Sequence, residues 1–99
     1  MLTAIQVRET QLPTTFMRQA YNQDQVNDLV DRIAATLSAY ELDMAILPSR
    51  AVKASEVLNY RFDSVSFTKG YDRLAVNDLL HQAAKALGVW EKRYDGSPE

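Results

Sequence analysis

Residues 71–80 of this chain read YDRLAVNDLL, and residues 21–30, fifty positions earlier, read YNQDQVNDLV. The two stretches share the tyrosine and the run Val-Asn-Asp-Leu at the same offsets. The correspondence continues on both sides without insertion or deletion, through the pairs Ala4 and Ala54, Val7 and Val57, Leu37 and Leu87, and Glu41 and Glu91. Self-similarity at a fixed period indicates that one structural unit has been duplicated.

The repeat predicts how the chain is organised. Residues 1–49 form the first repeat and residues 51–99 the second, called copy one and copy two from here on. A unit of about 50 residues buries too little surface to be stable alone, so the two copies are expected to share a core. Residues 1–99 are therefore predicted to be one cooperative domain made of two tandem repeats.

The composition is typical of a globular protein, with 46% hydrophobic and 24% charged residues. No apolar run approaches the ~18 to 20 residues that span a bilayer. The N-terminal residues also lack the basic start and apolar run of a secretion signal. These features predict a cytoplasmic protein. Because the chain has no cysteine and a single histidine, His81, neither a metal nor another cofactor is expected.

The charge distribution argues against nucleic acid as a partner. The formal net charge is −2. Copy one carries an excess of acidic residues and copy two is close to neutral, so neither provides the basic face that binds phosphates. The first long helix predicted below carries Arg32 as its only basic residue. No nucleic-acid partner is therefore expected.

Each copy contains a start signal for a long helix. Asn22 and Asp72 occupy equivalent positions and are residue types that cap helix N-termini. Gln25, three residues after Asn22, can complete a capping box by bonding back to the backbone of the cap. Tyr21 and Tyr71 precede the caps, where an aromatic side chain can staple the start of the helix.

The predicted helices follow from these caps. The first long helix is expected from Gln23 to about Ile46 and should stop before Pro48, since the residue before a proline disfavours helix. The second is expected from Arg73 to about Tyr94. The segments 49–59 and 3–8 are expected to make one or two helical turns each.

Apolar residues in both long helices recur at alternating steps of four and three, an average spacing typical of a helix-pairing seam. The fold class predicted is mainly α, with two copies of a loop plus a long helix packed as a coiled-coil-like pair, and a four-helix bundle if the chain dimerises. The predicted seam residues are Val26, Val30, Ile33, Leu37, Tyr40, Val76, Leu80, Ala83, Leu87 and Trp90.

The loop before each long helix carries a further pattern. Residues 62–72 read FDSVSFTKGYD, and Val76-Asn77-Asp78-Leu79 follows at fixed spacing. This combination resembles the N-terminal domain of the DivIVA family, bacterial scaffolds of cell division and polar growth. Copy one resembles it less closely, because Ala20 replaces the glycine and Asn22 the aspartate. The resemblance covers most of both copies.

The resemblance implies a non-enzymatic scaffold or adaptor that self-associates, through intrachain pairing of the copies or as a homodimer. It implies that each copy contributes a crossed loop and one helix of a parallel pair, and that a division protein is a partner. It also implies that an apolar and basic loop tip contacts the inner face of the cell membrane. By position, that tip is Phe67 with Lys69 in copy two, and Phe16 or Met17 with Arg18 in copy one. Family members continue into a long coiled coil that drives assembly, whereas this sequence ends at Glu99. Filament-like assembly therefore does not follow from the resemblance, and the two copies can instead pair with each other within the chain.

Two alternatives remain open at the level of sequence. The loop phenylalanines can instead fold back on the helix pair as a lid. The whole chain can be an unrelated helical module for protein–protein interaction, or, less consistent with its charge, a small DNA-binding helical protein. No residues combine as nucleophile, base and oxyanion donor, so catalysis is not expected.

The remaining polar and aromatic features have structural interpretations. The Asn-Asp pairs at 27–28 and 77–78, and His81, are predicted to face solvent. Tyr40 and Trp90 occupy matched positions and are predicted to belong to the core rather than to a ligand pocket.

Overall fold

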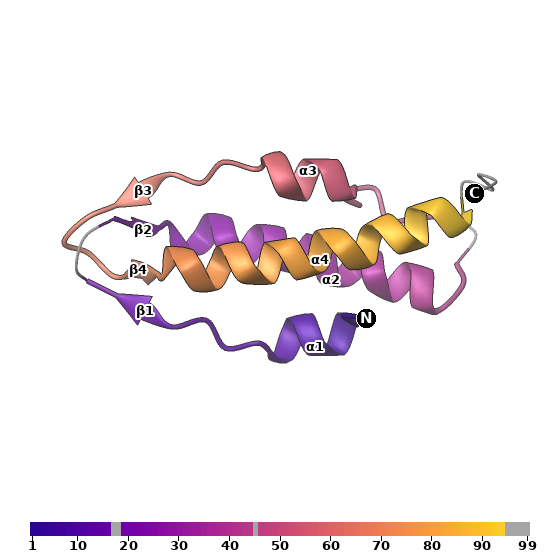
Figure 1. Cartoon of the computed structure of the whole chain (residues 1–99), viewed down its shortest axis with the longest axis horizontal. Coiled ribbons are helices and arrows are strands. Elements are labelled where there is room, and N and C mark those ends of the chain that lie inside the picture. The colour runs from indigo at the N-terminus through magenta and orange to yellow at the C-terminus, as the bar shows by residue number, and fades with distance from the viewer. Residues whose placement is uncertain (17–18, 45, 95–99) are drawn as a thin grey trace.

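The secondary structure repeats at the same offset as the sequence. The computed structural model describes residues 1–16, 19–44 and 46–94 (Figure 1). In copy one the elements are α1 (Ala4–Glu9), β1 (Thr14–Thr15), β2 (Ala20–Tyr21) and α2 (Gln23–Glu41). In copy two they are α3 (Ala54–Asn59), β3 (Ser64–Val65), β4 (Gly70–Tyr71) and α4 (Arg73–Tyr94). The prediction of a mainly helical chain is confirmed, and a small antiparallel sheet is present that was not predicted.

The sheet is built by exchange between the two copies. Its strand order is β1-β4-β2-β3, and all three pairings are antiparallel. The outer strands each pair with the inner strand of the other copy, as in the register Ala20 opposite Val65. The two inner strands meet at Tyr21 opposite Tyr71. Two-residue strands are too short to show the alternation of apolar and polar residues that reveals a strand in sequence.

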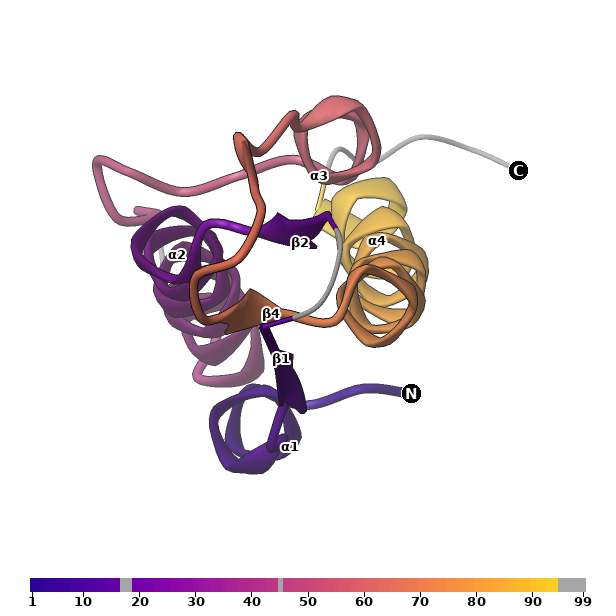
Figure 2. The same ribbon diagram turned by 90° about the vertical axis from the view of Figure 1, so that its left-hand side faces the viewer.

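The long helices start beside this sheet and run in the same direction. Figures 1 and 2 show α2 and α4 side by side, with α1 and α3 on opposite sides of the pair. Within each copy the short helix packs on the long one. Glu41 Oε2 accepts a hydrogen bond of 2.9 Å from the backbone N–H of Ala4, and Glu91 Oε2 one of 2.7 Å from Ala54. These glutamates thus satisfy backbone donors that a helix start leaves free.

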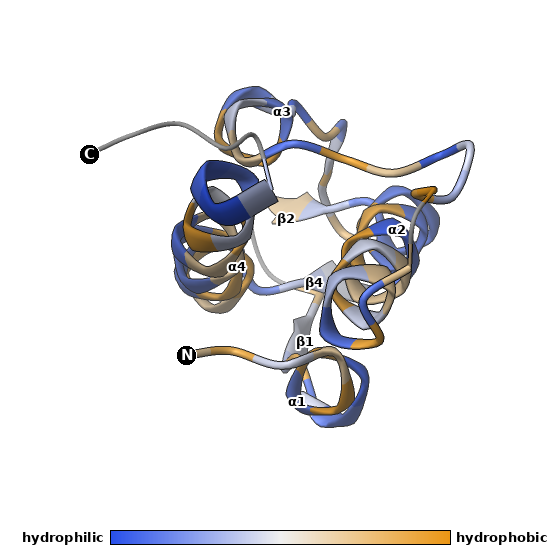
Figure 3. Cartoon of the chain, turned by 90° about the vertical axis from the view of Figure 1, so that its right-hand side faces the viewer, coloured by the Kyte–Doolittle hydropathy of each residue, from blue (hydrophilic) through white to orange (hydrophobic). Residues whose placement is uncertain are grey.

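The core lies between the four helices and is continuous through both copies. Figure 3 shows hydrophobic positions recurring along the ribbons of α2 and α4, and both helices contribute buried residues to this core. Val30 and Trp90 are half-buried against this core. The other predicted seam residues are buried in it: Val26, Ile33, Leu37, Tyr40, Val76, Leu80, Ala83 and Leu87.

The first long helix is shorter than predicted, because α2 ends at Glu41 rather than near Ile46. Asp43 has φ 54°, in the left-handed region, and its N–H donates to the Tyr40 carbonyl. The N–H of Met44 reaches back to the carbonyl of Ala39 over 3.0 Å. This pair of bonds is a Schellman-type C-cap, for which aspartate is a less common signal than glycine. The bounds predicted for the second long helix are confirmed, since α4 runs from Arg73 to Tyr94.

The predicted helix caps are confirmed, but the capping box is not. Asn22 accepts from the N–H of Gln25, and Asp72 accepts from that of Ala75, each over 3.0 Å. The N–H of Asn22 is already bonded to the carbonyl of Asp63, so the Gln25 side chain has no return partner at the cap. It binds Asp63 instead, donating to Oδ2 over 2.9 Å and accepting from the backbone N–H over 2.7 Å.

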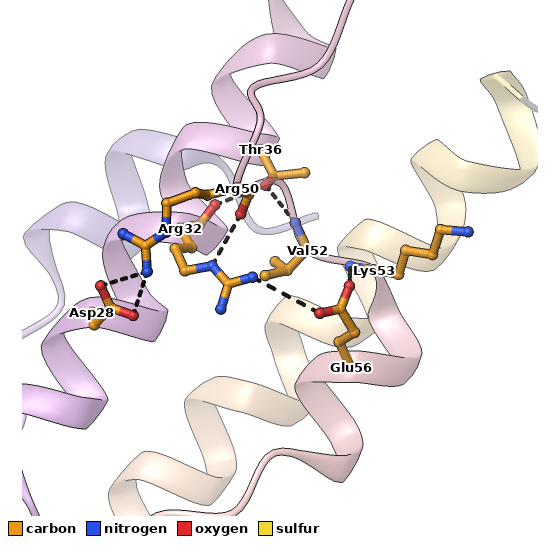
Figure 4. A network of polar contacts seen from close by, with 7 residues as sticks. All are labelled: Asp28, Arg32, Thr36, Arg50, Val52, Lys53 and Glu56. Atoms are coloured by element: carbon orange, nitrogen blue, oxygen red, sulfur yellow. Dashed lines mark hydrogen bonds and ion pairs between the residues drawn. The ribbon is translucent and has the colours of Figure 1, made fainter.

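The linker between the copies is held on α2 by a polar network (Figure 4). Thr36 is the only buried polar residue in the described part of the chain. Its hydroxyl accepts from the N–H of Val52 over 3.1 Å and donates to the carbonyl of Arg32 over 2.7 Å. Arg32 Nε donates to the carbonyl of Arg50, whose guanidinium pairs with Asp28 over 2.9 Å. Asp28 therefore makes an exposed ion pair rather than facing solvent alone.

Candidate functional site

The loops that connect the strands of each copy lie together at one end of the molecule (Figure 1). Phe67 is 87% exposed and Phe16 is 62% exposed. Lys69 is also exposed. Met17 and Arg18, the other residues predicted at this tip, fall outside the described residues.

The lid interpretation is wrong for both phenylalanines, because neither covers the helix pair. Other side chains close this end of the core: Leu12, Phe62, Tyr21 and Tyr71 are half-buried against it. Tyr21 and Tyr71 lie in β2 and β4, and Leu12 and Phe62 precede β1 and β3, whereas Phe16 and Phe67 lie in the loops that follow β1 and β3. Because these four side chains already pack against the core here, Phe16 and Phe67 are not needed to cover it.

Phe67 also has a backbone conformation that side chains rarely adopt. Its φ is 61°, in the left-handed region. A bulky residue there places Cβ close to the following carbonyl, at a cost of roughly 1–2 kcal/mol. The exposed ring gains no burial to offset this cost. Strain of this kind is most often found at functional positions, and an observed case supports a functional hypothesis.

Gly70 brings the central strands close together. A Cβ at this position would lie 2.7 Å from the Ala20 Cβ and 2.9 Å from the carbonyl oxygen of Tyr21. Ala20 is itself fully buried. The two equivalent residues therefore face each other, and there is room for one methyl group but not two. A Cβ at residue 70 would also lie 2.7 Å from Val65 Cγ2, so glycine is the residue that fits at this position.

The tyrosine and the asparagine that recur in both repeats are hydrogen-bonded across the copies. The hydroxyl of Tyr71 donates to Asn27 Oδ1 over 2.7 Å, and that of Tyr21 donates to Asn77 Oδ1 over 3.2 Å. Asn27 is exposed, as predicted, and Asn77 is half-buried, but the hydrogen bonds that both make to the other copy were not predicted. The signal that could have revealed this link was the identity of both residue types in both copies. The Tyr21 ring additionally packs on Phe62, with ring centroids 4.9 Å apart.

An aromatic cluster lies toward the other end of the long helices. The rings of Tyr40 and Trp90 are stacked, with centroids 5.7 Å apart and an interplanar angle of 1°. Tyr94 packs on both, and the guanidinium of Arg93 lies 4.9 Å from the Trp90 ring centroid. Tyr40 is buried and Trp90 half-buried, as predicted for core residues.

The environment of Tyr94 changes its acidity. Its hydroxyl donates a hydrogen bond to Asp43 Oδ1. This bond stabilises the protonated phenol and, with smaller effects of burial and of the Asp43 charge, raises the pKa of Tyr94 above its usual value of 10.0. His81 is exposed on α4, in agreement with its predicted position.

Within residues 1–16, 19–44 and 46–94, no group of three or more His, Cys, Asp or Glu side chains is placed to hold a metal ion. No helix in this part of the chain has both the length and the apolar character needed to cross a bilayer.

Comparison of the chain with protein-family models, curated proteins and solved structures finds no match.

Proposed function

We propose that this chain is a DivIVA-like, non-enzymatic scaffold whose loop tip contacts the inner face of the cell membrane. The single observation that carries the proposal is Phe67, which is 87% exposed and held in a left-handed conformation beside the exposed Lys69. An aromatic ring at the interface and a cation near anionic headgroups are the two components of a peripheral membrane anchor.

The position of the second loop supports the same proposal. Phe16 is 62% exposed and directly follows β1, whose end lies beside the β3–β4 loop that carries Phe67 (Figure 1). One aromatic residue and one cation bind a membrane only marginally. Two tips on one rigid body reach the same surface together, so the second contact forms at a high effective concentration.

The exchange of strands between the copies also supports the family resemblance. Each outer strand pairs with the inner strand of the other copy, so the loops cross before the long helices begin. We propose that α2 and α4 then form the coiled-coil-like pair of such a scaffold within a single chain, with the buried seam residues at its centre. A division protein is the proposed partner of the assembled scaffold.

Vesicle co-sedimentation tests the membrane contact. The vesicles contain phosphatidylcholine alone or phosphatidylcholine mixed with phosphatidylglycerol. Wild-type protein is expected to sediment with the anionic vesicles. Phe67→Asn/Lys69→Gln should weaken this binding tenfold or more, because burial of a ring contributes about 1.5–3 kcal/mol and one cation about 1 kcal/mol.

The control variant replaces the same kinds of side chain, one apolar and one basic, at positions away from the loop tip. Ile46, at 80% exposed, and Lys85, also exposed, lie away from the loop tip. Ile46→Asn/Lys85→Gln should bind as the wild type does. Absence of wild-type binding, or an equal loss in both double variants, would overturn the proposed membrane contact.

Light scattering tests the proposed intrachain helix pair. A chain whose copies pair internally is expected to have the mass of one molecule, 11.2 kDa. A mass twice as large would instead favour a four-helix dimer and reject pairing within one chain.

A further inference from the structure

The two copies differ at one groove. In copy one a groove of about 330 Å³ lies between α1 and α2 and reaches the neighbouring strand β4. Its lining includes the apolar residues Val7, Leu12, Val30 and Leu79, the polar residues Arg8, Asn27 and Asp31, and Tyr71. Thr10 lies at its margin and is exposed.

The equivalent place in copy two is filled by aromatic rings. Tyr60 stands at the position of Thr10, and Phe62 at that of Leu12. The Tyr60 and Phe62 rings have centroids 4.9 Å apart, and Phe62 lies 4.9 Å from the Tyr21 ring. All three rings pack against the shared core. Copy one has Thr10 and Leu12 where copy two has Tyr60 and Phe62, so the smaller side chains leave open, beside α1 and α2, volume that two rings take up in copy two.

In copy two, the ring of Tyr60 is carried by an extended segment of backbone. Tyr60 follows α3 in an extended conformation, with φ −68° and ψ 137°. Its ring enters from a segment that continues to Phe62 without helix or strand. In copy one Leu12 already holds part of the corresponding space, while Thr10 turns its hydroxyl to the carbonyl of Gln6 over 2.7 Å. The open volume of the groove thus corresponds to one aromatic ring, at the position that Tyr60 has in copy two.

We propose that this groove binds one tyrosine or phenylalanine side chain from an extended segment of a partner polypeptide. Leu12, at the position of the Phe62 ring that contacts Tyr60 in copy two, lines the groove together with Tyr71 and Val30. Asn27 already holds the Tyr71 hydroxyl over 2.7 Å, so the ring wall is in place before a ligand binds. The site is separate from the loop tip, and its occupancy does not depend on membrane contact.

Binding of a single ring in an open groove is expected to be weak, in the millimolar range. N-acetyl-tyrosinamide is the probe, and N-acetyl-leucinamide is the matched aliphatic control. Amide spectra of the ¹⁵N-labelled full chain should show saturable shifts at Val7, Thr10, Asn27 and Val30 with the tyrosine probe. The aliphatic control should give shifts at least threefold smaller.

The second copy provides an internal control in the same spectra. The equivalent amides of Val57, Tyr60, Asn77 and Leu80 are expected to stay unchanged, because their groove is filled. Thr10→Tyr should close the groove of copy one and abolish the shifts there. Conversely, Tyr60→Thr should open a groove in copy two and add saturable shifts at Val57 and Asn77.

Three results would overturn the proposal. The first is the absence of saturable shifts when the wild-type protein is titrated with the tyrosine probe. This result does not depend on whether any variant folds. The second is an equal response in both copies, or a response that survives in a folded Thr10→Tyr protein. The third is a set of groove shifts that arises on raising the protein concentration alone and disappears in Phe67→Asn, which would assign the groove to the exposed phenylalanine of a second copy.

Discussion

The hydroxyl of Tyr71 donates a hydrogen bond of 2.7 Å to Asn27 Oδ1, which links the last residue of β4 to the second turn of α2 in the other copy. Tyr21 and Asn77 make the reciprocal bond over 3.2 Å. The start of each long helix is thus held by a strand of the other repeat. The repeats are therefore joined at the sheet end by side chains as well as by backbone pairing.

Tyr71→Phe should lower the free energy of unfolding by about 0.5–1.5 kcal/mol, the net contribution of one hydrogen bond. Tyr21→Phe should cost less, because its bond is longer and its ring keeps its contact with Phe62. Urea denaturation measures both values. A double-mutant cycle with Asn27→Ala isolates the Tyr71–Asn27 term, and a coupling energy of zero would show that the bond does not link the copies.

Gly70→Ala should lower the free energy of unfolding by about 1–3 kcal/mol, the usual cost of overpacking a core. The added methyl would meet the Ala20 Cβ at 2.7 Å and a backbone oxygen at 2.9 Å. Ala20→Gly in the same chain should restore part of the loss by removing one of these contacts. If Gly70→Ala unfolds at the wild-type urea concentration, the close strand approach is not required.

Gly88→Ala should raise the free energy of unfolding by about 1 kcal/mol, since alanine has the higher helix propensity. Gly88 lies inside α4, and a Cβ there would meet no atom within 4 Å. Thermal or urea unfolding measures the gain. A destabilised variant would indicate that another molecule or segment packs on this side of the helix.

Phe67→Asn should leave stability unchanged or raise it by up to about 1 kcal/mol, because asparagine tolerates the left-handed region better than phenylalanine. Little burial is lost, as the ring is 87% exposed. Phe16→Asn is the matched control, since Phe16 is exposed without a positive φ. A marked loss of stability in Phe67→Asn alone would show that the ring packs in solution.

Asp43→Asn should lower the pKa of Tyr94 toward that of an ordinary tyrosine, because it removes the carboxylate that accepts the hydrogen bond of the phenol. Because the folded-state pKa is raised, the bond stabilises the fold fully below the unfolded-state pKa of about 10. That stabilisation is lost as pH rises through the folded-state pKa. Ultraviolet absorbance between pH 8 and 12 measures the phenolate. Identical titrations of both proteins would contradict the Tyr94–Asp43 bond.

Several elements were predictable because their causes are local. Asn22 and Asp72 cap helices through their own side chains, and each acts on an N–H three residues ahead. The seam spacing places apolar residues on one helical face, and the described residues are buried there accordingly. The early end of α2 was missed because Asp43 adopts a left-handed conformation that its residue type permits but does not require. That residues 1–99 unfold as one cooperative unit stays a prediction.

The candidate tip residues were found by their loop position and spacing, but exposure could not be predicted from them. A phenylalanine beside a core can pack or protrude, and the choice depends on which other side chains reach the same space first. Here Leu12 and Phe62, with the two strand tyrosines, occupy it. The groove of copy one could likewise not be predicted from the sequence. The difference between Thr10 and Tyr60 points to a groove only when the neighbours of both residues are known.

By itself, the sequence determined that the protein consists of two equivalent helical units with matched starts and a shared apolar face. These properties depend on contacts within a few residues along the chain. The tertiary structure alone decided that the strands exchange between copies, that residues 20 and 70 have room for a single methyl group, and that Phe67 protrudes. Each of these depends on atoms brought together across about fifty residues, and a repeat pattern records that the copies are alike without recording how they meet.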